Sequence, residues 1–103
     1  MDRGFVADRP LGYVQAAAGA VDSAVTLASL LPGGVVPPGT CMVLITPEAQ
    51  AIRFRDDGTA PTTAIGFPLA VGTSLQYTGG NLPGLRLISQ TAGAIVNIAL
   101  YGQ

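Results

Sequence analysis

The sequence predicts an all-β domain, a small antiparallel β-sandwich or barrel of about seven or eight strands. Three observations lead to this prediction. Fourteen glycines and eight prolines divide the 103 residues into short apolar segments at fairly even spacing. Several segments alternate between apolar and polar residues, which is the period of a strand. Charged residues are only 11% of the chain, against about 25% in ordinary globular domains.

The middle of the chain carries the clearest strand signals. Residues 40–48 (TCMVLITPE) are almost continuously apolar, which is typical of a central strand. In residues 51–57 (AIRFRDD), Ile52 and Phe54 share the face expected to join the core, and both arginines lie on the other face. Alternation places these later residues together on inward faces: Leu75 with Tyr77, Leu85 with Leu87, and Val96 with Ile98 and Leu100.

The first part of the chain is harder to assign. Residues 1–12 are expected to form an extended N-terminal arm, and residues 13–103 a single β domain. The arm is either a frayed terminus or a segment that orders on a neighbouring molecule, with Phe5 as its anchor. Residues 13–22 fit a helix or strands equally well, and residues 23–30 (SAVTLASL) alternate as a strand. The pattern does not distinguish a sandwich from a barrel.

Residues with catalytic or metal-binding chemistry are sparse. Asp56 and Asp57 are the only adjacent carboxylates, and neighbours on a strand point to opposite faces. The chain has no histidine, and its single cysteine, Cys41, lies in an apolar stretch where a small buried residue is expected. A zinc site or a catalytic thiolate would need partners that are missing from the sequence. We therefore expect no enzyme activity, no cofactor and no metal ion.

Charge and hydropathy also limit the partners. The net charge is -1 and the five cationic residues are dispersed arginines, so we expect no nucleic-acid binding. Residues 14–31 are rich in alanine but interrupted by Gln15, Asp22 and Ser23, so no membrane span is predicted. The first twelve residues lack the apolar run of a signal peptide. We expect a soluble protein that is used in the cytosol or in an assembly formed there.

The scarcity of charge predicts that other subunits cover part of the surface, because interface cores are depleted in Lys, Asp and Glu but retain Arg. A closed homo-oligomer, with a trimer favoured, would also hide exposed strand edges. Asp57 and Gly58 predict a turn at a strand end, and Arg55 is expected to pair with Asp57 there. The candidate interface residues are Phe5, Arg9, Arg53, Arg55, Asp57 and Phe67.

Residues 45–69 (ITPEAQAIRFRDDGTAPTTAIGFPL), 75–80 (LQYTGG) and 85–101 (LRLISQTAGAIVNIALY) form a pattern that covers a little over half the chain. This pattern resembles a group of small structural proteins of tailed-bacteriophage virions. The first 44 residues resemble them more weakly, in VTLASLLPGG and PPGTCMVLI. The resemblance implies an all-β component of the virion and brings no catalytic residue with it.

Composition and resemblance together lead us to expect a capsid decoration or cement protein. Such a protein would bind the major capsid protein, or other virion proteins, in particles assembled in the host cytoplasm. A neck, tail or baseplate component is the alternative. A carbohydrate-binding adhesion module is a weaker one, because stacking platforms need exposed aromatics and the chain has three Phe, three Tyr and no Trp.

Overall fold

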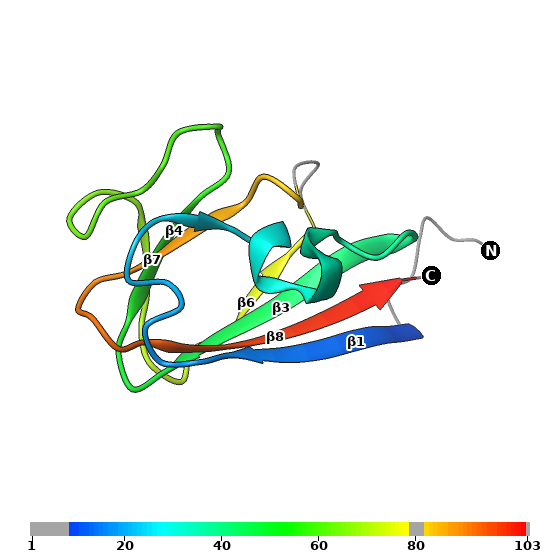
Figure 1. Cartoon of the computed structure of the whole chain (residues 1–103), viewed down its shortest axis with the longest axis horizontal. Helices are drawn as coiled ribbons and strands as arrows, with labels where there is room; N and C mark the ends of the chain where they lie inside the picture. The colour runs from blue at the N-terminus through cyan, green and yellow to red at the C-terminus, as the bar shows by residue number, and fades with distance from the viewer. Residues whose placement is uncertain (1–8, 79–81, 103) are drawn as a thin grey trace.

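The computed structural model describes residues 9–78 and 82–102. These residues form an all-β sandwich of two antiparallel four-stranded sheets, which confirms the predicted fold class (Figure 1). The first sheet has the order β1 (Arg9–Ala16), β8 (Ile95–Gly102), β3 (Thr40–Glu48) and β6 (Leu75–Tyr77). The second has the order β2 (Val25–Thr26), β7 (Arg86–Ser89), β4 (Ile52–Arg55) and β5 (Phe67–Leu69). Two short 3-10 turns, η1 (Ala28–Leu30) and η2 (Pro32–Gly34), follow β2.

The core lies between the sheets and follows the predicted alternation. Ile98 in β8 is fully buried and lies in register between Val14 of β1 and Ile45 of β3. Ile52 and Leu87 face them from the second sheet and are also fully buried. Burial of these apolar side chains is the main force that holds the sheets together.

Ile88 departs from the alternation, because it is buried although its neighbour Leu87 already faces the core. Ile88 lies in register with Arg53 on the outer face of the second sheet. Arg53 bonds there to the segment that joins β4 to β5. This segment, residues 56–66, crosses that outer face, so the second sheet has apolar contacts on both sides.

The N-terminal boundary differs from the prediction. Arg9 already pairs with Gly102, and β1 then continues along β8, so residues 9–12 belong to the sheet and not to an arm. A register shift between Pro10 and Gly12 lets the strand accommodate two residues that resemble a loop in sequence. Phe5 and the rest of the proposed arm lie outside the described residues.

Residues 13–30 also receive a definite structure. Strand β1 runs through Ala16, and hydrogen-bonded turns then lead to Asp22, so the ambiguous stretch holds strand and turn. The strand expected over residues 23–30 shortens to β2, because the backbone turns into η1 after Thr26. The Ser29 hydroxyl donates to the Thr26 carbonyl and supports this turn.

The side chain of Cys41 is only half-buried, less than the sequence predicted. No helix among residues 9–78 and 82–102 is long and apolar enough to cross a membrane.

Candidate functional site

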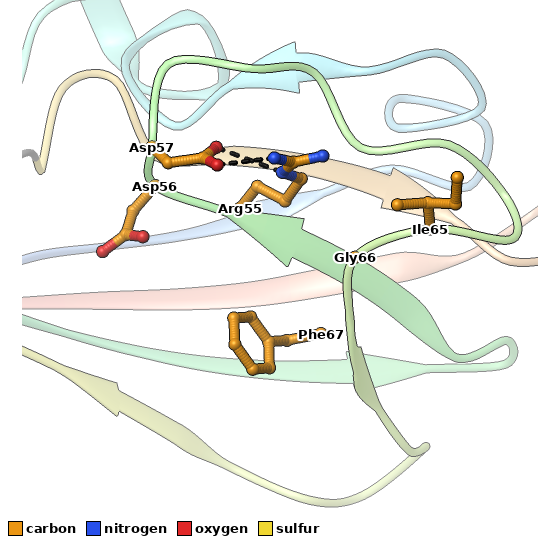
Figure 2. A pocket seen from close by; sticks show the side chains of 6 residues that line it. All are labelled: Arg55, Asp56, Asp57, Ile65, Gly66 and Phe67. Carbon is orange, nitrogen blue, oxygen red and sulfur yellow. Dashed lines mark hydrogen bonds and ion pairs between the residues drawn. The ribbon is translucent and has the colours of Figure 1, made fainter.

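A hollow of about 430 Å³ lies at the rim of the sandwich, where β4 ends and β5 begins (Figure 2). The residues that line it are Arg55, Asp56, Asp57, Ile65, Gly66 and Phe67. They come from the two ends of segment 56–66 and from the adjoining strands. Figure 2 shows the Arg55–Asp57 pair on one side of the β4 ribbon and Asp56 with Phe67 on the other. The hollow therefore combines charged and apolar walls.

The charged wall is built by one ion pair. Arg55 Nε donates to Asp57 Oδ1 at 3.1 Å, and Arg55 Nη2 donates to Asp57 Oδ2 at 2.5 Å. The Thr59 backbone N–H also donates to Asp57 Oδ1, at 3.2 Å. These bonds hold the pKa of Asp57 below its usual range, with the Arg55 bond as the larger cause, and the bond to Asp57 raises the pKa of Arg55. The pairing predicted from strand parity is confirmed.

Arg53 has a different role from Arg55, although both point to the outer face. Its Nε donates to the Thr63 carbonyl at 3.1 Å and its Nη1 donates to the Gly66 carbonyl at 2.8 Å. The Thr62 hydroxyl accepts the backbone N–H of Ile65 at 2.9 Å and stabilises the turn between these carbonyls. Arg53 thus holds segment 56–66 in place and acts on the hollow indirectly.

The apolar wall centres on a cross-strand aromatic pair. Phe54 and Phe67 are register partners, with ring centroids 5.5 Å apart and an interplanar angle of 27°. Phe67 remains 66% exposed and Ile65 59% exposed. Phe54 was predicted to lie in the core and is only half-buried, because it pairs with the edge strand β5. The Tyr77 hydroxyl donates to Asp56 Oδ2 at 2.7 Å and connects the other sheet to this rim.

The structure brings four of the six predicted interface residues together. Arg55, Asp57 and Phe67 line the hollow, and Arg53 supports it. Arg9 is remote from it, since it begins β1 beside Gly102. Ile65 also lines the hollow, but it was not among the residues predicted from the sequence. It could have been noticed as a large apolar side chain in a loop of proline, threonine and alanine, where no strand pattern explains it.

The arrangement is suited to contact with another protein, because exposed apolar side chains and charged groups alternate around the hollow, with Ile65 on the side of the Arg55–Asp57 pair and Phe67 on the other side of β4 (Figure 2). The described residues contain no group of three or more His, Cys, Asp or Glu side chains that could hold a metal ion. No family model, curated protein or solved structure matches the chain.

We expect the Asp57 carboxyl to titrate below about pH 3.9, the ordinary value for aspartate. Because its folded pKa is lowered, the Arg55–Asp57 pair stabilises the rim fully above the ordinary pKa. That contribution is lost as the pH falls through the lowered value. Carboxyl-carbon NMR should show that Arg55→Ala moves the Asp57 midpoint upward but not fully to 3.9, since the Thr59 bond remains. Arg53→Ala is the control and should leave the midpoint in place; an unmoved midpoint in Arg55→Ala would contradict the assignment.

Proposed function

We propose that the protein is a non-enzymatic structural component of a tailed-phage particle, a capsid decoration protein that stabilises the head from between capsid subunits. The observation that carries the proposal is that two large apolar side chains, Ile65 and Phe67, line one hollow and are both largely exposed. Large exposed apolar groups that share one site mark surfaces where proteins bind. The whole hollow lies within residues 45–69, the longest stretch that resembles the phage proteins.

The physical basis of attachment is burial of this apolar wall, repeated over many copies. Arg55 and Phe67, which line the same hollow, are of the residue types that are enriched in or typical of interface hot spots. Each contact is small, but many copies bound next to one another on a shell increase the total binding strength by multivalency. The low surface charge suits this role, because few charged groups would lose water on assembly.

The test is co-sedimentation of the purified protein with expanded phage heads and, separately, with isolated tails. We expect saturable binding to heads at many copies per particle. Binding to tails alone would contradict the decoration role and favour a neck, tail or baseplate component. Absence of binding to both would contradict a virion role.

Phe67→Ala should weaken the binding to heads about 30-fold or more, the effect of losing a hot-spot residue worth about 2 kcal/mol. The matched control is Val35→Ala, since Val35 is 60% exposed and does not line the hollow. This control should bind as the unchanged protein does. Equal binding by both variants would remove the hollow from the mechanism.

A further inference from the structure

We propose that the free edge of β1 pairs with the same edge of a second copy of this chain, so that two copies share one continuous sheet. Strand β1 lies at the end of the strand order β1–β8–β3–β6, along one margin of the sandwich, and within the described part of the chain it pairs with β8 alone (Figure 1). An edge strand presents a row of unpaired N–H and C=O groups that another chain can pair with. The inference goes beyond the proposed function and does not rest on it, because it assigns a different surface.

The four sheet edges of the described residues differ in length. Strand β2 has two residues, and β5 and β6 have three each, with Pro68 in the middle of β5. Short edge strands and prolines are devices by which natural proteins prevent edge-to-edge pairing. Strand β1 has eight residues, and its own devices, Pro10 and the register shift, lie before Gly12. Residues 12–16 therefore form a regular, uncharged edge without such protection.

Burial at two glycines indicates that the backbone of this stretch is accessible. A glycine has only backbone atoms, so its exposure is that of the chain itself. Gly12 in β1 is exposed, whereas Gly102 in the central strand β8 is buried. The two large exposed side chains of the stretch are directed toward β8 and away from the free edge, because the Tyr13 hydroxyl and Gln15 Nε2 both donate to Asn97 Oδ1. Another strand can therefore approach from the side.

The chemistry of the edge favours a second copy as the occupant. Antiparallel pairing of one strand with itself follows a twofold axis, so the backbone donors and acceptors of the two copies match by symmetry. Arg9 is the single charged residue of β1 and stands at its start, so antiparallel pairing places the two arginines at opposite ends of the ladder. The uncharged stretch that follows offers no group to select a charged partner peptide.

The regular part of the strand sets the register. Residues 12–16 are used in full only if the twofold axis passes Val14. Tyr13 then lies opposite Gln15 of the second copy, and Gly12 opposite its Ala16, so outward residues meet outward ones and inward residues meet inward ones. Val14 meets its own counterpart, and β-branched side chains pack well against neighbours on a pleated surface.

Two copies complete this assembly, in place of the trimer favoured by composition. A ring of three would need β1 to pair with a different edge of the next copy, and β6, the other edge of the same sheet, has only three residues. The ladder covers residues 12–16 of each copy and is shorter than a standard interface, so we expect the dimer to depend on concentration.

The first test measures the mass of full-length variants by analytical ultracentrifugation up to about 1 mM, the weak end of ordinary affinities. The double variant Tyr13→Lys/Gln15→Lys places like charges opposite each other across the twofold axis, and Tyr13→Lys/Gln15→Glu places opposite charges there. We expect the unchanged protein to dimerise, and the second double variant to dimerise at least about tenfold more tightly than the first. Gln76→Lys adds a charge at the other edge, on an exposed residue of β6, and should dimerise like the unchanged protein. Circular dichroism checks that every variant is folded.

Amide hydrogen exchange of the unchanged protein is the second test and needs no variant. Alternate amides of residues 12–16, those that do not bond to β8, should exchange at least about twofold more slowly at about 1 mM than in dilute solution. The amides of β6 should exchange equally at both concentrations. The proposal is overturned by a monomer or trimer at about 1 mM, by loss of association in Gln76→Lys, by equal association of the two double variants, or by exchange in residues 12–16 that ignores concentration.

Discussion

Replacing Ile98 with alanine should lower the free energy of unfolding by about 2–5 kcal/mol. The Ile98 side chain is completely buried (0% exposed), and its strand β8 lies between β1 and β3. The substitution leaves a cavity that tightly registered neighbours, Val14 and Ile45, cannot fill without shifting both strands. Urea denaturation followed by circular dichroism measures the loss.

Ile65→Ala is the matched control, because it removes the same atoms from a side chain that is 59% exposed. We expect a change within about 0.5 kcal/mol, as for most surface substitutions. Comparison of the Ile98→Ala and Ile65→Ala variants distinguishes apolar side chains that stabilise the fold from those available to a partner. Similar losses at the two positions would mean that Ile65 belongs to the core and that the hollow is closed.

Replacing Gly66 with alanine should destabilise the protein by about 1–3 kcal/mol, the cost of a strained backbone conformation. Gly66 has a φ of +138°, a backbone conformation that residues with a side chain rarely adopt. A Cβ atom there would lie 3.1 Å from the Cβ atoms of both Arg53 and Pro61, and 3.3 Å from the Phe54 carbonyl oxygen. The chain would have to move away from β4, which breaks the Arg53 bond to the Gly66 carbonyl.

Gly58→Ala provides the comparison, since Gly58 also has a positive φ (+87°) but no other atom would lie within 4 Å of an added Cβ atom. Chemical denaturation should show the smaller loss for Gly58→Ala, because strain acts there without crowding. Binding to heads should weaken clearly in Gly66→Ala and little in Gly58→Ala. If Gly66→Ala were as stable as the unchanged protein, the close packing of segment 56–66 on β4 would be wrong.

Strands with a strong local pattern could be predicted from the sequence. The apolar run of β3 and the alternation of β8 identified both strands, and the alternation of β8 also identified its inward face, because a period of two reflects burial on one side. Strand β1 was not recognised at its start, since Pro10 and Gly12 resemble loop residues. Only pairing with β8 across more than eighty residues makes that stretch a strand.

The residues around the hollow could also be predicted only in part. The period of two placed Arg55 and Asp57 on one side and led to their pairing. The bonds from Arg53 to Thr63 and Gly66 were not predictable, because they depend on the path of a long loop that tertiary contacts determine. Pro68 held an unused signal: a proline in the middle of a strand favours an edge position, which explains the exposure of Phe67.

Pairing of Arg9 with Gly102 has a practical consequence, because it brings the start and end of the β domain together. Neighbouring ends make the fold a good candidate for circular permutation. A short linker from Gln103 to Met1, with the chain reopened in the exposed turn at Gly72 and Thr73, should preserve both sheets.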